Sequence, residues 1–433
     1  MRRREFLENA SLALGATALA AQAQATEPAA AAAPVAAADW RGLRAQFSLT
    51  PDYVHLATFL LASHPAPVAR AIETHRRALD ANPADYYHSH GIAMEGDCAR
   101  AAADYMGGRW QQVALTDSTT MGLAMVYSGL RVQAGDELLQ TVHDHYSTDM
   151  SLQHKAARSG ATVRRVALYD EPATVSVEQC QARLKSAITA RTRVVAVTWV
   201  HSSTGVKLPV QALAQVVEEA NRDRDESARI LFCVDGVHGF GIEDQDVTQL
   251  GCDFFIAGTH KWIFGPRGTG MIWGSDAGWA RCEPVIPAFG AAYGPWLGLL
   301  KPEHVPRGMY FTPGGFHSFE HRWALPEAFR LHLQLGKANV QARIHALNTQ
   351  TKEGLAAMPH VTLHTPADSA LSSGLVCFDV AGMKPQQVVE RLHAKGIIMS
   401  ATPYRQSHAR FAPSLLNDEA EIDRALAQIR ALA

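Results

Sequence analysis

Short apolar runs alternate with helix-like stretches through the middle of this chain. The runs are rich in Val, Ile and Phe: Glu137 to Val142, Thr162 to Ala167, Arg193 to Val200, Ile230 to Val234 and Phe254 to Ala257. Helix-like stretches separate several of these runs, for example Ser176 to Thr189 and Val210 to Asn221. This alternation predicts an α/β fold with a mostly parallel sheet. In such a fold, ligands bind beyond the carboxyl ends of the strands.

The C-terminal third of the chain has a different pattern. After a stretch rich in Gly, Pro and aromatic residues, a long helical stretch is expected from Ala324 to Ala357. Short strand-like runs follow at Val361 to His364 and Gly374 to Val380. We therefore expect a large domain at 39–310 and a smaller α+β domain at 311–433.

The composition is that of an ordinary globular protein. The chain has 433 residues, of which 47% are hydrophobic and 19% charged, and its 40 basic and 42 acidic residues nearly balance. Without a basic excess, nucleic acid is not an expected partner. After the N-terminal segment, no apolar run reaches the ~18 residues of a membrane span, so no stable span is predicted.

The first 25 residues have the features of an export signal. A basic start, Arg2-Arg3-Arg4, precedes a small apolar run, Leu12 to Ala21, and small residues follow at a spacing that suits cleavage. Arg3-Arg4-Glu5-Phe6-Leu7 resembles a signal for the twin-arginine translocase, which exports folded proteins; a plain Sec signal or an uncleaved anchor is the alternative. Residues 26–38, rich in Ala and Pro, predict a linker. The resemblance implies a periplasmic location.

Two polar segments near predicted strand ends carry the strongest chemical signal. Phe232-Cys233-Val234-Asp235-Gly236-Val237-His238 places an acid at the end of an apolar run, and Gly258-Thr259-His260-Lys261-Trp262 places a lysine in a short loop. A pyridoxal phosphate (PLP) enzyme needs this pair. The lysine forms a Schiff base with the cofactor aldehyde, and the carboxylate keeps the pyridine nitrogen protonated. Taken one at a time, the two are also compatible with a turn aspartate and a surface lysine.

These segments stand in an order that resembles the class V aminotransferase family. The order is a Thr/Ser-rich turn at Asp117–Thr120, a histidine loop at His143–Ser147, a turn at His201–Gly205, and then the segments of Asp235 and Lys261. The resemblance runs from about Tyr53 to the C-terminus. It is to the branch that holds cysteine desulfurases and isopenicillin N epimerase-like enzymes. It implies a fold-type I PLP enzyme with a mostly parallel, seven-stranded-type sheet, assembled as a homodimer.

The resemblance also implies roles for individual residues around the cofactor. Lys261 would carry PLP and act as the base at Cα, with Asp235 at the pyridine nitrogen and His145 stacked over the ring; His143 is the rival for that last position. The positions implied to bind the cofactor are Ser118, Thr119, Thr120, His145, Ser202, Asp235, His238, His260 and Lys261. Gly258 is a departure, because the family often has a serine there.

Two arginines near the C-terminus are candidates for holding a substrate carboxylate. Arginine suits that task because it offers two parallel N–H donors. Arg405 and Arg410 lie where the resemblance implies such a residue, and Arg405 is the preferred candidate. The turn at 312–315 resembles a segment that contacts the phosphate of the neighbouring subunit. Because Phe316 and His317 replace the usual threonine after the glycine, that contact between subunits is in doubt.

The cysteines and histidines argue against two other chemistries. None of the six cysteines forms a C-x-x-C pair, and the stretch 400–408, where cysteine desulfurases carry a nucleophilic cysteine, has none. Cys377 lies in an apolar run and is expected to be buried. The pairs His88-Ser89-His90 and His143-Asp144-His145 would suit a metal hydrolase, but isolated H-x-H pairs are weak signals. The sequence therefore predicts no metal site.

The function predicted from the sequence is PLP-dependent chemistry on the amine of an amino acid or small peptide. Motifs shared by the whole family do not choose among transamination, epimerisation, elimination and oxidative tailoring. The alternatives are a non-catalytic ligand-binding protein that keeps the PLP fold, and desulfurase- or lyase-type PLP chemistry.

Overall fold

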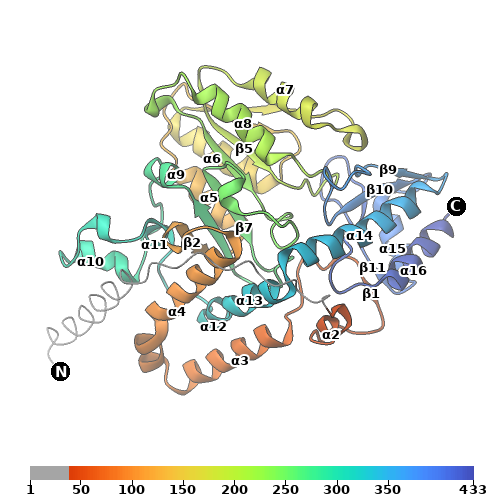
Figure 1. The fold of residues 1–433 in the computed structure, drawn as a ribbon, viewed down its shortest axis with the longest axis horizontal. Helices are drawn as coiled ribbons and strands as arrows, with labels where there is room; N and C mark the ends of the chain where they lie inside the picture. Colours follow the sequence, from red (N-terminus) through yellow and green to blue (C-terminus); the bar gives the residue numbers. More distant parts are fainter. Residues whose placement is uncertain (1–38) are drawn as a thin grey trace.

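The computed structural model describes residues 39–433, so the predicted signal peptide and linker lie outside the described residues. A seven-stranded sheet forms the centre of the larger part (Figure 1). Its strands, in spatial order, are β2 (Val113–Thr116), β8 (Gly270–Gly274), β7 (Phe254–Gly258), β6 (Leu231–Asp235), β5 (Thr192–Thr198), β3 (Glu137–Thr141) and β4 (Thr162–Val166). Only β8 runs antiparallel to its neighbours. The predicted mostly parallel α/β sheet is confirmed.

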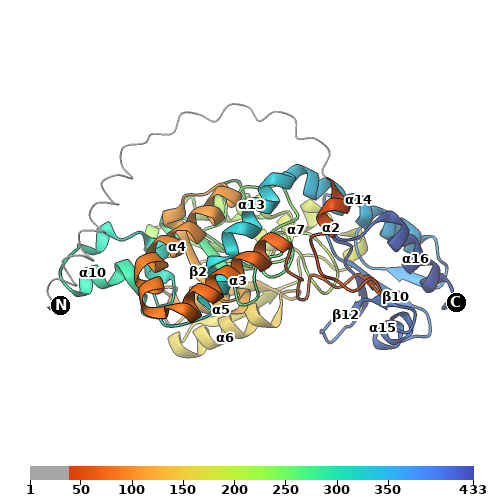
Figure 2. The ribbon, with the colours of Figure 1, turned by 90° about the horizontal axis from the view of Figure 1, so that it is seen from below.

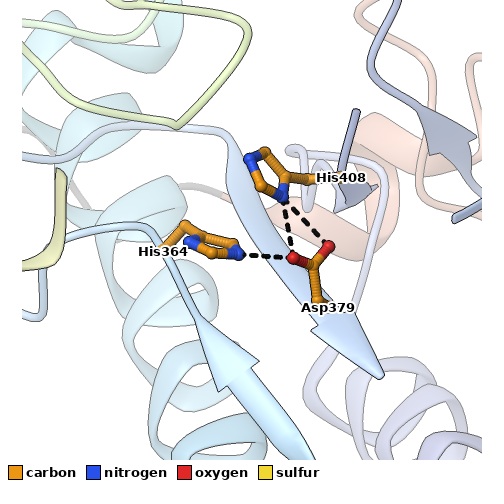
Figure 3. Close-up of side chains that lie close together, drawn as sticks. All are labelled: His364, Asp379 and His408. Atoms are coloured by element: carbon orange, nitrogen blue, oxygen red, sulfur yellow. Dashed lines mark hydrogen bonds and ion pairs between the residues drawn. The ribbon is translucent and has the colours of Figure 1, made fainter. Parts of the chain in front are cut away.

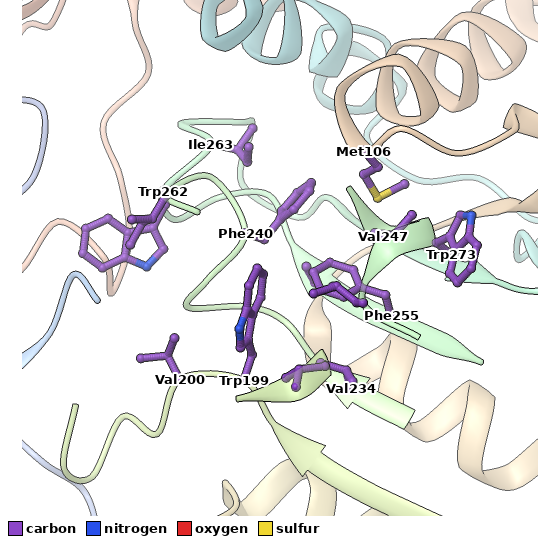
Figure 4. Packing of buried hydrophobic residues seen from close by; sticks show 14 of the residues in the cluster. Met106, Trp199, Val200, Val234, Phe240, Val247, Phe255, Trp262, Ile263 and Trp273 are labelled. Carbon is purple, nitrogen blue, oxygen red and sulfur yellow. The ribbon is translucent and has the colours of Figure 1, made fainter. Parts of the chain in front are cut away.

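Alternate side chains of each strand enter two separate hydrophobic layers, because successive residues of a strand point to opposite faces. In β6, Phe232 and Val234 join one core cluster, whereas Leu231 and Cys233 join the other. Figure 4 shows Val234 with Phe255 and Phe240 in the first layer. A sheet covered on both faces explains the apolar runs of its central strands β6 and β7.

Helices cover both faces of the sheet (Figures 1 and 2). One face is covered by α5 (Thr119–Gly129) and α6 (Tyr146–Ser159), whose buried residues lie in the second core cluster. The other face is covered by α4 (Pro83–Met106), α7 (Val177–Ala187), α8 (Val210–Asn221) and α13 (Leu325–Leu335). Helices α3 (Ala66–Ala81) and α12 (Phe319–Trp323) pack on this second group. Three short helices come after β8 in the chain: α9 (Asp276–Ala280), α10 (Tyr293–Trp296) and α11 (Arg307–Phe311).

A smaller antiparallel sheet lies at the C-terminal end of the molecule. Its order is β12 (Ser400–Ala401), β13 (Ala409–Phe411), β10 (Val376–Val380) and β9 (Val361–Leu363). Helices α14 (Lys337–Ala356), α15 (Pro385–His393) and α16 (Glu419–Arg430) share one hydrophobic core with it. The N-terminal segment, with α2 (Trp40–Arg44), reaches this part, where β1 (Val54–His55) pairs in parallel with β11 (Ile397–Ile398).

The predicted helical stretch from Ala324 to Ala357 is helical over nearly its whole length, but it is divided in two. The chain forms α13 and α14 as separate helices, divided at Gly336. Gly336 has φ +81°, a backbone conformation outside the helical region that glycine adopts without a Cβ clash.

In the part of the chain that the structure describes, no helix is both long and apolar enough to span a membrane.

Candidate active site

Asp235 and Lys261 lie at the same edge of the large sheet. Asp235 is the last residue of β6, and Lys261 follows shortly after the end of β7, the neighbouring parallel strand. Parallel neighbours bring the segments after their carboxyl ends together. Asp235 is buried and accepts a hydrogen bond from the Val237 N–H at 3.2 Å. The two groups that the sequence places in separate segments therefore meet at one site.

Burial shifts the pKa values of this pair in opposite directions. Loss of solvent raises the pKa of Asp235, against the pull of the Val237 N–H and the Lys261 charge. Loss of solvent also lowers the pKa of Lys261; the Asp235 charge opposes this change and the Arg410 charge adds to it. A lysine with a lowered pKa is neutral for more of the time near pH 7, and a neutral amine is the nucleophilic form.

His238 links the lysine to a tryptophan. The Lys261 Nζ lies 3.3 Å from His238 Nε2, and Trp262 Nε1 donates a hydrogen bond to His238 Nδ1 at 3.3 Å. An indole N–H only donates, so Nδ1 must accept, and the neutral imidazole carries its proton on Nε2. Burial holds the pKa of His238 well below its usual value, so the ring is neutral. The Nε2–H of His238 therefore faces the Lys261 amine. The amine can accept a hydrogen bond from this N–H only when the amine is neutral.

The predicted phosphate residues gather at the N-terminus of α5. Ser118 caps the helix by accepting a hydrogen bond from the Met121 N–H, and Thr119 Oγ1 accepts one from the Gly258 N–H at 2.8 Å. A helix N-terminus offers free N–H groups and the positive end of the helix dipole, which suit a phosphate. Thr120 instead pairs its hydroxyl with Ser147 at 2.9 Å.

The close packing around position 258 explains why a glycine stands where the family often has a serine. A Cβ built on it would lie 2.9 Å from both Thr119 Oγ1 and the His260 ring, too close for either to stay in place. The His260 Nδ1 is buried and has no hydrogen-bond partner among residues 39–433. An unpaired buried polar atom beside a helix N-terminus fits a phosphate oxygen. This corner therefore has the features of a phosphate site, with Thr119 and His260 beside it.

His145, rather than His143, is the histidine near Lys261. His145 caps α6, where its Nδ1 accepts a hydrogen bond from the Ser147 N–H at 3.2 Å. Burial lowers the pKa of His145, and the Lys261 charge lowers it further. His143 points elsewhere and stacks on Tyr169, with the ring centres 4.0 Å apart.

The two candidate arginines lie in different environments. Arg410 is buried, donates to the Ser202 carbonyl at 2.6 Å and to Ser400 Oγ at 3.1 Å, and lies over the Phe59 ring at 4.3 Å. Arg405 is exposed and forms no hydrogen bond or ion pair with any residue that the structure describes. The structure thus places Arg410 in the site, where its charge also acts on Lys261.

Two residues of the site, Phe59 and Tyr404, were missed from the sequence. Phe59 comes from the N-terminal segment and packs against His238, Trp262 and Arg410. The Tyr404 hydroxyl forms a hydrogen bond with Ser202 Oγ at 2.7 Å. Ser202 is one of the residues that the resemblance implies for cofactor binding, and its hydroxyl is therefore already paired. Tyr404 directly precedes Arg405, so the sequence singled out this segment but not the Tyr404 side chain. Phe59 carries no local sequence signal.

The described cysteines offer no exposed thiol. All six are free and buried. Burial raises the pKa of the Cys377 thiol to about 12, so it stays protonated near pH 7.

In the turn that resembles a subunit-contact segment, the Thr312 hydroxyl accepts a hydrogen bond from the Leu115 N–H, and Phe316 is 83% exposed. The contact between subunits stays a prediction.

A model of the aminotransferase class-V family matches residues 62–409, most of the chain. The chain belongs to the aminotransferase class-V family. Among curated relatives, isopenicillin N epimerase of Streptomyces clavuligerus is 27% identical over 90% of this chain and 97% of its own. The isopenicillin N epimerase of Amycolatopsis lactamdurans is 26% identical over 80% and 87%. The predicted family and its epimerase-like branch are confirmed.

Solved structures confirm the fold. A mutant of C-DES with glycine covalently linked to its PLP cofactor has a TM-score of 0.78 and 22% identity, covering 89% of this chain and 98% of its own. The apo cysteine desulfurase of Thermococcus onnurineus NA1 has a TM-score of 0.76 and 20% identity, covering 94% and 99%. The fold-type I assignment and the class of PLP-dependent enzyme predicted for this chain are confirmed by fold and family together.

Proposed function

We propose that this protein acts on the free amine of an amino acid or small peptide-like molecule, using PLP bound at Lys261. One observation carries the proposal. The Lys261 amine, the Asp235 carboxylate and the neutral His238 ring converge where β6 and β7 end, with Arg410 close enough to act on the lysine. Bound PLP supplies an aldehyde that captures amines and a ring that withdraws electrons from the bonds at Cα.

The residues of this chain divide the remaining tasks. Asp235, the buried last residue of β6, would hold a proton on the pyridine nitrogen of bound PLP. Lys261 would hold the cofactor through its aldehyde and would supply the base for the proton at Cα. Its lowered pKa suits that task, since a base works best when its pKa lies near the ambient pH.

Arg410 is the residue we propose to bind the substrate carboxylate. Its guanidinium is fixed on one side by the Ser202 carbonyl and below by the Phe59 ring, so it loses little freedom on binding. The neighbouring Phe59 and Tyr404 give this end of the site an aromatic wall. Arg405, the preferred candidate from the sequence, is an exposed residue.

Sulfur transfer from cysteine is the less supported alternative. A desulfurase needs a reactive thiolate in a loop of the small domain, whereas segment 400–408 has no cysteine and the described thiols are buried. A non-catalytic binding role is less supported as well, because a pure binder has no use for a lysine of lowered pKa beside a buried acid.

We further propose that the protein is a homodimer and is exported folded to the periplasm. Several large apolar side chains are exposed near one another in the chain, including Trp296 at 80% and Phe316 at 83%, as expected of a surface that a second copy covers. Twin-arginine export would carry the enzyme with PLP already bound. The dimer proposal rests on the family resemblance and on this surface. The export proposal rests on the resemblance of the N-terminal segment to a twin-arginine signal.

A panel of amino acids and free-amine peptides in deuterated water tests the function. Purified protein loaded with PLP should exchange the Cα hydrogen of at least one member of the panel for deuterium, and Lys261→Ala should not. Release of a keto acid would then assign amine transfer, and inversion at Cα would assign epimerisation. Colour from bound PLP without a spectral change or exchange for any compound would favour the non-catalytic binder.

A further inference from the structure

A cluster of two histidines and an aspartate lies in the small sheet, apart from the residues assigned to PLP (Figure 3). His364 Nε2 lies 2.8 Å from Asp379 Oδ2, and His408 Nδ1 lies 3.0 Å from both carboxylate oxygens of Asp379. The imidazole centres are 3.9 Å apart. Three potential ligand atoms therefore converge on one point.

The strand register explains the convergence. His364 directly follows β9, and His408 directly precedes β13, while Asp379 belongs to β10, which lies between them. Phe378 pairs with Ala409 of β13 and with Leu363 of β9, and both pairings are antiparallel. The register therefore places His408 directly opposite Asp379. His364 lies two residues beyond Thr362, the β9 partner of Asp379, and is therefore diagonal to Asp379. All three side chains leave the face opposite the one that Phe378 buries in the core.

The side-chain partners of Asp379 are two histidines. Among residues 39–433, no lysine or arginine forms an ion pair with it, and its two partners are imidazoles. Two histidines and one carboxylate are a frequent ligand set for zinc and related ions, with bonds of ~2.0–2.2 Å. Such bonds separate tetrahedral ligand atoms by about 3.3 Å, and the three candidate ligand atoms here lie within 4.8 Å of one another.

We propose that His364, Asp379 and His408 bind one divalent transition-metal cation, with Zn²⁺ as the probe. Binding displaces the protons that the imidazoles otherwise donate to the carboxylate, and it leaves a fourth position for water. His408 is buried, whereas His364 and Asp379 are partly exposed, which gives the ion a route of entry.

The cation would brace the loop that borders the active site. His408 and Arg410 are alternate residues of one strand segment, so they share a face of the sheet. The His408 N–H donates to Thr402 Oγ1 at 2.9 Å, which ties together the two ends of segment 402–408. That segment carries Tyr404 to its bond with Ser202. The expected role is structural, because the ligands do not reach Lys261.

Zinc binding to the full PLP-loaded protein tests the proposal. After dialysis against a chelator and readdition of zinc, gel-filtered wild type should keep about one ion per chain and melt at a higher temperature than without zinc. His364→Gln removes one ligand but keeps an amide donor for Asp379. It should lose zinc affinity by at least about tenfold while its melting temperature without zinc stays near that of wild type. The exposed His393→Gln is the matched control and should bind as wild type does.

Two results would overturn the site. Wild type that keeps no zinc and shows no thermal shift would mean that the three residues form only a hydrogen-bonded cluster. Zinc retained equally by His364→Gln would mean that it binds elsewhere. X-ray absorption at the zinc edge guards against a variant that fails to fold: wild type should show nitrogen and oxygen ligands including imidazole, and sulfur ligands would contradict the assignment.

Discussion

The large sheet and the small sheet contribute to the site in different ways. On the large sheet, Asp235 and Lys261 follow two neighbouring parallel strands, so the backbone itself sets their places. On the small sheet, Arg410 reaches the site only through contacts with distant segments, the Ser202 carbonyl and the Phe59 ring. The comparison teaches that the chemistry is fixed by strand order, whereas recognition of the substrate depends on how two parts of the chain meet.

The largest effect should come from the large-sheet side. Lys261→Ala removes both the cofactor attachment and the base, and we expect Cα hydrogen exchange to fall by at least about a thousandfold. The fold should persist, because among residues 39–433 the lysine amine has one long contact, to His238, and no ion pair within 4 Å. Circular dichroism checks the fold, and mass spectrometry of the substrate measures the exchange. Exchange at the wild-type rate would show that the large sheet does not hold the chemistry.

On the small-sheet side, Arg410→Gln should reduce kcat/KM by about a hundredfold, since a charged hydrogen-bond pair with the substrate carboxylate is lost. Arg405→Gln is the matched control and should stay within about twofold, as surface substitutions do. Steady-state kinetics on the best substrate of the panel measures both. The opposite order of effects would restore Arg405 as the carboxylate ligand.

Gly258→Ala tests how tightly the phosphate corner is packed. The added methyl group would meet Thr119 Oγ1 and the His260 ring at 2.9 Å, so we expect PLP affinity to fall by about tenfold. Gly96→Ala, where a Cβ meets only the flexible end of Arg100, should leave the affinity unchanged. Titration of apoprotein with PLP gives both constants. An unchanged affinity in Gly258→Ala would place the phosphate elsewhere.

The smallest effect concerns pH. Wild-type Lys261 has a lowered pKa, so apoprotein should capture PLP faster as pH rises through that value, below the usual pKa of lysine. Trp262→Phe frees His238 Nδ1, so the imidazole can place its proton there and accept from a charged lysine through Nε2. The pKa of Lys261 then rises, the profile moves to higher pH, and capture at pH 7 slows by about fivefold.

Trp273→Phe is the control for this pH profile. Its indole N–H is buried without a hydrogen-bond partner among the described residues, so its loss breaks no such bond. Equal shifts in the two variants, or none in Trp262→Phe, would refute the tautomer assigned to His238.

The sequence predicted the large-sheet side better than the small-sheet side. Continuous apolar runs mark buried parallel strands, and the polar residues that follow them fall at one edge, so Asp235 and Lys261 could be placed together. Arg410 lies inside a short strand of the small sheet, and its pairing with Phe59 spans most of the chain, which no local pattern records. The cluster of His364 and His408 depends on strand register in the same way, and a single glycine, Gly336, was enough to divide the predicted long helix.

Covalent trapping identifies the reactive lysine most directly. Protein loaded with PLP, reduced with borohydride and digested, should yield one pyridoxyl-modified peptide that carries the modification on Lys261. Under the same treatment, Asp235→Asn should still be modified at Lys261, because the carboxylate tunes the ring and does not bind the aldehyde. Modification of a different lysine, or of none, would contradict the placement of PLP chemistry where β6 and β7 end.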